Sequence, residues 1–276
     1  MAGRFPGAAN LDAFWEDLQA GRCRVTEVPP ERWDVSAYYD PNPDQPGKSP
    51  CKWGGFLDDI ASFDPRFFQM SGAEAEFTDP QQRLFMEEAW SALEHAGYSD
   101  RWLSKRKVGV FVGVGAGDYV HKMIADGLEA SPYAFMGNGV AVLAGRIAYL
   151  LDLHGPALAV DTACSSSLVA LHLACQSVQS GECEMALAGG VFVATTPGFH
   201  ALTGKLGMLS PTGQCRAFDQ GANGFVPGEG VGVVVLRPLE AALRDGDTIH
   251  GVIVASGSNQ DGRSYGIAAP SALAHR

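Results

Sequence analysis

The sequence has few of the features that mark metal, redox, membrane or nucleic-acid-binding proteins. Its six cysteines form no C-x-x-C pair, so neither a zinc site nor a dithiol redox motif is indicated. With 20 lysines and arginines against 31 aspartates and glutamates, the net charge of −11 argues against a nucleic-acid surface. No apolar run approaches the roughly 18–20 residues that span a bilayer, and residues 1–7 lack the apolar core of a signal peptide. We therefore expect a cytoplasmic protein with reduced thiols, no metal, and no membrane or nucleic-acid partner.

The length and composition are those of a globular protein. A chain of 276 residues can bury one large core or two small ones. Hydrophobic residues at 46% and charged residues at 18% are ordinary for such a chain. The sequence contains no internal repeat of the kind that builds solenoids or propellers.

Capping residues and hydrophobic periodicity divide the chain into predicted elements. We expect helices at 10–20, 79–96, 138–153 and 239–244, and strands at 108–114, 157–160, 185–188, 230–236 and 248–257. Gly21 ends the first helix, and Asp79-Pro80 suits the cap and first turn of the second. The short connection before the last strand predicts a mixed sheet.

Three polar or glycine-rich stretches are interpreted as structural. The glycines at 113–117 lack G-x-G-x-x-G spacing, so they predict a tight turn rather than a nucleotide site. Glu87, Glu88 and Glu94 are expected on a solvated helix face. The proline-rich segment 25–52 is expected to be a surface loop that either covers the core or contacts a neighbouring domain.

The central stretch, 157–190, reads as strand, sharp turn, helix and strand, with Cys164 at the turn. A thiol there lies at the positive end of the helix dipole among unpaired backbone N–H groups. Both features favour thiolate over thiol, and the same N–H groups can hold a developing oxyanion. The alternative, that Cys164 is a small buried residue, is equally compatible with its position alone.

Acyl transfer to a thiolate needs acid–base or charge-stabilising partners within about 3 Å. His172 lies eight residues along the same predicted helix, about 12 Å further on at 1.5 Å per residue, and cannot reach Cys164. His200 lies in the loop after the strand at 185–188, so it is the histidine that we consider for an approach to Cys164. His95, His154 and His250 are interpreted as helix-end, surface or core residues.

Beyond position, the residues D-T-A-C-S-S-S-L at 161–168 resemble the active-site signature of the β-ketoacyl synthases, specifically the ketosynthase domains of modular polyketide synthases. Further matching motifs occur in family order along nearly the whole chain: G-R-F-P-G-A at 3–8, D-P-Q-Q-R-L at 79–84, G-V-F-V-G at 109–113, A-G-R-I-A-Y at 144–149, G-M-L-S-P-T-G at 207–213, F-V-P-G-E-G at 225–230 and N-Q-D-G at 259–262.

The resemblance implies an α/β protein with the thiolase-like layered αβαβα fold. Residues 1–276 would be a partial domain, with the N-terminal half at about 1–237 and the start of the C-terminal half at about 238–276. We expect the first strand and the downstream H-G-T-G-T and N-I-G-H type histidine motifs to be missing.

The resemblance also implies a chemistry. Cys164 would accept an acyl chain from a phosphopantetheine thioester on an acyl carrier protein, and a malonyl-type extender would then condense with it. No cofactor bound by the chain itself is implied. The implied partners are the carrier protein, a second copy of the domain and other polyketide synthase domains. Residues implied to contact substrate are Met136, Phe199, Thr203, Met208 and Ala268. Met136 would reach across the dimer, and Ala268 stands where the family often has threonine.

Two alternatives stay open at this point. A ketosynthase that lacks the downstream histidines transfers chains, or serves as a docking domain, without condensing, and an isolated fragment is inactive. A cysteine hydrolase is weaker, because Thr162 and Ser166 occupy the glycine positions of a G-x-C-x-G elbow.

Overall fold

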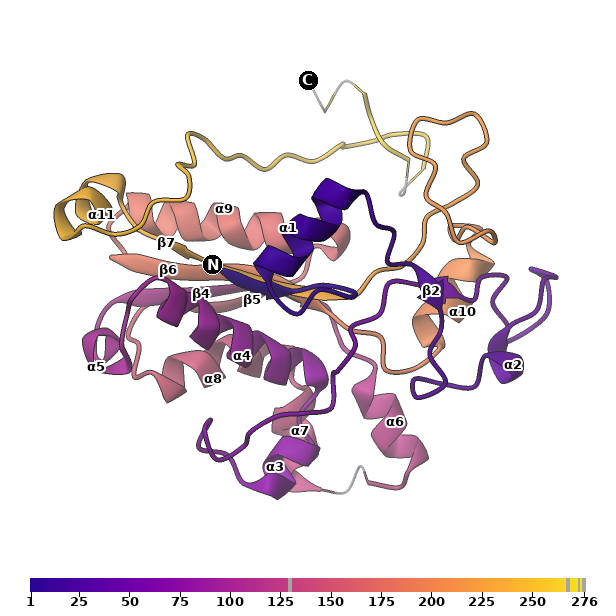
Figure 1. Ribbon diagram of the computed structural model, residues 1–276, viewed down its shortest axis with the longest axis horizontal. Helices are drawn as coiled ribbons and strands as arrows, with labels where there is room; N and C mark the ends of the chain where they lie inside the picture. The colour runs from indigo at the N-terminus through magenta and orange to yellow at the C-terminus, as the bar shows by residue number, and fades with distance from the viewer. Residues whose placement is uncertain (129–130, 267–268, 273, 275–276) are drawn as a thin grey trace.

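The computed structural model describes residues 1–128, 131–266, 269–272 and 274, and these residues are built around a mixed five-stranded sheet (Figure 1). Its strands are β1 (Ala2–Arg4), β4 (Val108–Gly113), β5 (Ala157–Val160), β6 (Met185–Phe192) and β7 (Gly230–Leu236), in the order β1-β7-β6-β4-β5. β4 is parallel to β5 and β6, whereas β7 is antiparallel to β6 and β1. The sheet is mixed, as predicted, although residues 248–257, on which that prediction depended, contribute no strand to it.

Helices cover both faces of the sheet. They are α1 (Leu11–Ala20), α2 (Val35–Tyr38), α3 (Gly72–Glu76), α4 (Pro80–His95), α5 (Asp100–Leu103), α6 (Tyr119–Ala125), α7 (Pro132–Asn138), α8 (Val140–Leu150), α9 (Ser166–Gln179), α10 (Gly198–Lys205) and α11 (Leu239–Asp245). β2 (Thr26–Glu27) and β3 (Trp53–Gly54) form a separate ribbon. In Figure 1, α4 and α8 lie on one face and α9 on the other, giving α/β/α layers. Within the described residues, none of these helices has the length and apolar character needed to cross a membrane.

On β6, the two faces of the sheet carry side chains of different size. Strand residues alternate between faces, so Val110 and Leu187 join the large core with α4 and α8. The opposite face presents Ala186 and Ala188 to α9. Because these alanines are small, α9 packs close to the backbone of the sheet.

The predicted helix ends are mostly confirmed. The Asn10 side chain accepts a hydrogen bond from Ala13 N at 2.9 Å, and Gly21 ends α1 with φ of 62°. Asp79 caps α4 through Gln81 N at 2.8 Å. The single helix expected at 138–153 is wrong at its start, because Gly139 adopts an extended conformation and separates α7 from α8.

β1 corrects two predictions. Residues 2–4, for which no strand was predicted, form β1 and pair with β7. This pairing brings Arg4 to α4, where its guanidinium lies 2.7 Å from Glu88 and 2.8 Å from Glu87. Glu88 is therefore buried instead of solvated, and burial raises its pKa. Glu94 is exposed, as predicted.

Two of the predicted strands, 157–160 and 248–257, are not found in the structure as the sequence suggested. The apolar run at 157–160 is typical of a buried strand, but β5 is an edge strand that, among the described residues, pairs with β4 alone, and Leu158 is 46% exposed. Residues 248–257 form no strand, because they pair with no other strand of the described chain. The segment instead runs extended over α9 (Figure 1), where Ser256 Oγ lies 2.8 Å from His172 Nδ1.

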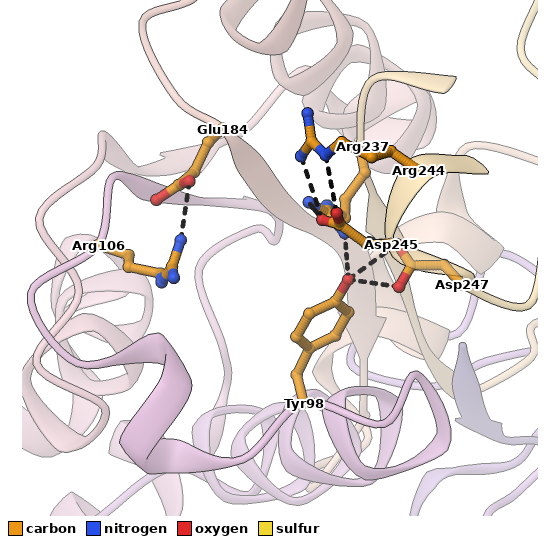
Figure 2. Close-up of polar contacts among 7 residues, drawn as sticks. All are labelled: Tyr98, Arg106, Glu184, Arg237, Arg244, Asp245 and Asp247. Carbon is orange, nitrogen blue, oxygen red and sulfur yellow. Dashed lines mark hydrogen bonds and ion pairs between the residues drawn. The ribbon is translucent and has the colours of Figure 1, made fainter. Parts of the chain in front are cut away.

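A polar network fixes the point where the chain leaves β7 (Figure 2). Arg237 donates hydrogen bonds to Asp245 at 2.7 Å and to Asp247 at 2.6 Å. The Tyr98 hydroxyl, beyond the end of α4, donates to Asp247 at 2.7 Å. Burial, together with this hydrogen bond, raises the pKa of Tyr98 to about 12. The network therefore joins α4 to the start of segment 248–257.

A buried ion pair holds the proline-rich segment 25–52, which is mostly irregular as predicted, against the sheet. The Arg32 guanidinium contacts both carboxylate oxygens of Glu229, at 3.0 and 2.9 Å. Glu229 also accepts from the backbone N–H groups of Leu57 and Ala194, at 2.8 and 3.0 Å. Arg32 donates in turn to the carbonyls of the same two residues. One pair therefore connects segments before β3, after β3, after β6 and before β7.

Replacing Glu229 with glutamine is expected to destabilise the full-length protein by about 3–5 kcal/mol, because it leaves a buried guanidinium without its counter-ion. The measurement is the change in free energy of unfolding, or in melting temperature. The control is Glu184→Gln, which breaks the solvent-exposed pair with Arg106 (Figure 2) and is expected to change stability by less than about 1 kcal/mol. An equal decrease in the free energy of unfolding of the two variants would show that the buried pair stabilises the protein no more than the exposed pair does.

Candidate active site

Cys164 lies in a 3₁₀ turn, Ala163–Ser165, between the end of β5 and the start of α9. Its side chain is exposed, so the alternative of a small buried cysteine is wrong. Ala163, the residue before it, has φ of 55°, in the left-handed region that non-glycine residues seldom adopt. The chain thus turns sharply, and the thiol stands at the N-terminal end of a 14-residue helix.

Hydrogen bonds within the turn hold this conformation. Ser166 Oγ accepts from Thr162 N at 2.9 Å and donates to the carbonyl of Ala163 at 2.7 Å. Asp161 accepts from Ala163 N at 3.0 Å. Ser165 Oγ donates to the carbonyl of Thr162 at 2.9 Å. The polar residues around Cys164 are therefore used to shape the turn.

The start of α9 lies directly on the ends of two strands. A Cβ atom at Gly113, the last residue of β4, would be 2.5 Å from the carbonyl carbon of Ser166. A Cβ atom at Gly190 of β6 would be 2.7 Å from the Cβ atom of Ser167. Contacts this short do not occur, so both positions require glycine. The glycines near 113 serve close packing, in agreement with their interpretation as structural.

The predicted substrate-contacting residues fall into separate groups. Phe199 and Thr203 lie on α10, where Phe199 packs against Phe192 with ring centroids 5.1 Å apart and Thr203 Oγ1 donates to the carbonyl of Phe199. Met208 follows α10 and is 43% exposed. Met136 lies on α7 and is also exposed. Ala268 lies outside the described residues. The roles of all five stay predictions, as does the boundary at residue 237.

His200, His95 and His250 have structural partners. His200 is buried against Trp33 and Phe56, with Nε2 3.1 Å from the carbonyl of Trp53, and burial lowers its pKa. These contacts are those of a core histidine. His95 stacks on His250, with centroids 5.1 Å apart, beside the N-terminal amine.

A largely buried polar cluster at the carboxyl ends of β4 and β6 was missed by sequence reasoning. Gln81 Oε1 accepts from Val193 N at 3.3 Å, just after β6. Asp118, beyond β4, accepts from Thr195 and Thr196. The Asp79 carboxylate lies against Gly117, the residue before Asp118, where an added Cβ atom would be 1.9 Å from Asp79 Oδ2. The sequence signal is the D-P-Q-Q-R-L motif, whose local pattern indicates only a helix start.

Burial raises the pKa of Asp79 from 3.8 to about 6, and the nearby charge of Asp118 adds to this effect. The N–H of Gln81 opposes it. A group whose pKa is higher in the folded state holds a proton there that the unfolded chain has released. Asp79 therefore contributes a loss of stability that develops as the pH rises from about 4 to about 6, and that reaches about 3 kcal/mol.

Replacing Asp79 with asparagine keeps a good N-cap and removes the buried charge. We expect the stability of Asp79→Asn relative to the wild type to increase by roughly 1–2 kcal/mol between pH 5 and pH 7.5. The measurement is the free energy of unfolding of both proteins at the two pH values. A difference that does not change with pH would show that Asp79 is not protonated in this range.

Fold and site together define an α/β protein with an exposed candidate cysteine nucleophile at the carboxyl edge of its sheet. A family model described as "Beta-ketoacyl synthase, N-terminal domain" matches residues 1–242. The chain belongs to this family.

The similar proteins are polyketide synthases. The chain is 50% identical over 273 residues to a phthioceranic/hydroxyphthioceranic acid synthase of Mycobacterium tuberculosis, covering 98% of this chain and 13% of that protein. It is 49% identical over 272 residues to polyketide synthase PksL of Bacillus subtilis, covering 99% and 6% respectively. The chain therefore spans only a small part of these relatives.

Solved ketosynthases have the same fold. The ketosynthase from module 6 of the bacillaene synthase of Bacillus subtilis matches with a TM-score of 0.88 and 47% identity, over 99% of this chain and 45% of that one. The oxazolomycin ketosynthase domain OzmH KS7 of Streptomyces albus matches with a TM-score of 0.85 and 48% identity, over 90% and 44%. The resemblance and the thiolase-like fold predicted from the sequence are confirmed.

Proposed function

We propose that this chain is the part of a polyketide-type ketosynthase that carries the acyl-accepting cysteine. The thiolate sulfur of Cys164 attacks the carbonyl of an acyl thioester on the phosphopantetheine arm of an acyl carrier protein. The new bond joins that carbonyl to Cys164 as its bond to the arm breaks, and the arm leaves as a thiol after taking up a proton. The Cys164 backbone N–H faces the developing oxyanion.

Condensation follows on the same sulfur. A malonyl-type extender on the carrier loses carbon dioxide, and the resulting carbanion attacks the Cys164 thioester. The new carbon–carbon bond forms as the bond to Cys164 breaks, which returns the thiolate. In the family, two histidines and a lysine from motifs downstream of residue 276 assist these steps. We therefore expect this chain alone to be inactive in condensation.

The observation that carries the proposal is the position of Cys164. The thiol is exposed, it precedes a helix N-terminus, and it follows the carboxyl end of a parallel strand, where ligands bind in sheets of this kind. Family membership adds independent support. A ketosynthase that transfers chains without condensing has no comparable support.

The six free cysteines fit a reducing, cytoplasmic location.

A thiol-directed inhibitor of the cerulenin type is expected to label the full-length protein at Cys164. Peptide mass spectrometry identifies the labelled residue, and Cys164→Ala is expected to lose both the adduct and self-acylation by acyl thioesters. Cys23→Ala and Cys215→Ala are matched controls, because these cysteines are also exposed. An adduct that persists in Cys164→Ala would refute the assignment.

We also propose that the domain forms a homodimer through β5, besides its contacts with other polyketide synthase domains. β5 is an edge strand whose backbone can pair with a second copy. Its exposed Leu158, and Tyr149 near it in the chain at 88% exposed, supply apolar surface. This dimer would bring Met136 near the partner's site, as the family resemblance implies.

Leu158→Asp is expected to convert the dimer to monomer, because it places a charge in the proposed interface. Light scattering after size-exclusion chromatography gives the mass. Leu243→Asp is the control, since Leu243 is 65% exposed on α11 and its substitution leaves β5 unchanged. A dimer that survives Leu158→Asp would exclude β5 as the interface.

A further inference from the structure

Asp118 joins the two loops that leave neighbouring parallel strands at the carboxyl edge of the sheet. Asp118 follows β4, whereas Thr195 and Thr196 follow β6, which pairs with β4. One carboxylate oxygen accepts from the N–H of Thr195 at 2.9 Å and from its hydroxyl at 2.5 Å. The other accepts from the N–H and the hydroxyl of Thr196, each at 2.8 Å. A single side chain therefore holds the backbone of the second loop.

Thr196 transmits this constraint to α10. Its hydroxyl oxygen accepts from the N–H of Gly198, the first residue of α10, at 3.3 Å. The next residue is Phe199, whose ring packs edge-on against Phe192. Asp118 thus fixes the first turn of α10, and with it the position of Phe199.

Phe192 lies on the same side of the sheet as Cys164. It is four residues beyond Ala188 on β6, so both side chains point to the face covered by α9. Gly190, Gly113 and Val160 pair in register across β6, β4 and β5. At about 4.8 Å between strands, the backbones of β6 and β5 are about 10 Å apart. Phe192, against which Phe199 packs, and Cys164 therefore lie at the same carboxyl edge of the sheet, two strands apart.

We propose that Asp118 is a positioning residue that sets which acyl chains Cys164 accepts. It acts through Thr196 and Phe199 rather than on the thiol. The proposal rests on the function proposed above, in which Cys164 carries an acyl chain. When the hydrogen bonds between Asp118 and Thr196 are lost, the start of α10 is no longer fixed and Phe199 moves relative to Cys164. The rates at which short and long acyl chains react with Cys164 then change relative to each other.

Three substitutions separate this role from a general loss of stability. Asp118→Asn keeps one acceptor oxygen, but its amide nitrogen cannot accept from a backbone N–H, so one threonine N–H loses its partner. Thr196→Val removes the hydroxyl at similar volume, whereas Thr196→Ser keeps it. Tyr98→Phe is the stability control, because it removes a hydrogen bond at the opposite edge of the sheet (Figure 2).

The experiment measures self-acylation of Cys164 in the full-length protein by N-acetylcysteamine thioesters of increasing chain length, followed by mass spectrometry. The ratio of octanoyl to acetyl rates is expected to change at least about 10-fold in Asp118→Asn and Thr196→Val. We expect Thr196→Ser and Tyr98→Phe to stay within about 2-fold of the wild type. Rates that fall together at an unchanged ratio, or an equal change of ratio in Tyr98→Phe, would overturn the proposal.

A second series distinguishes failure of this inference from failure of the proposed function. Alkyl methanethiosulfonates from methyl to octyl react with the Cys164 thiolate, forming a mixed disulfide and releasing methanesulfinate, without any acyl transfer. If no thioester acylates the wild type, the proposed function fails. The octyl-to-methyl ratio in Asp118→Asn still decides the positioning role, since a changed ratio supports it and an unchanged ratio overturns it.

Discussion

The close approach of the first turn of α9 to the sheet is the constraint on which the rest of the site depends. Gly113 and Gly190 leave no room for a side chain between the strand ends and the helix. Alanines on β6 and on α9 continue this close packing along the helix. The position of Cys164 is therefore set by backbone packing, and the hydrogen bonds of the turn then define its local conformation.

Carboxylates hold the loops around this rigid centre. Glu229, paired with Arg32, fastens the segments before β7 and after β6, while Asp118 fastens the loop after β4 to the start of α10. Both accept hydrogen bonds from backbone N–H groups, so they fix the path of the chain and not only the side chains. Because these hydrogen bonds go to the backbone, the irregular segments have a fixed conformation, as the strands do.

The sequence predicted features that depend on local residues. Asn10, Asp79 and Gly21 mark helix ends because capping involves neighbours, and Cys164 was placed by the strand–turn–helix pattern around it. Features that depend on distant partners were missed. Glu88 is buried by Arg4, 84 residues away, and nothing in residues 248–257 indicates that they lack a strand to pair with.

The pairing of β1 with β7 has a consequence for biosynthesis. Ala2 lies opposite Val233, so the edge of the sheet is completed by residues that leave the ribosome far apart in time. At about 5–20 residues per second, the first strand waits roughly 10–50 s for its partner. Once β6 (Met185–Phe192) has been made, its flank stays an unpaired edge until β7 emerges, and nascent chains on one messenger are most exposed to mispairing with each other in this last part of the interval.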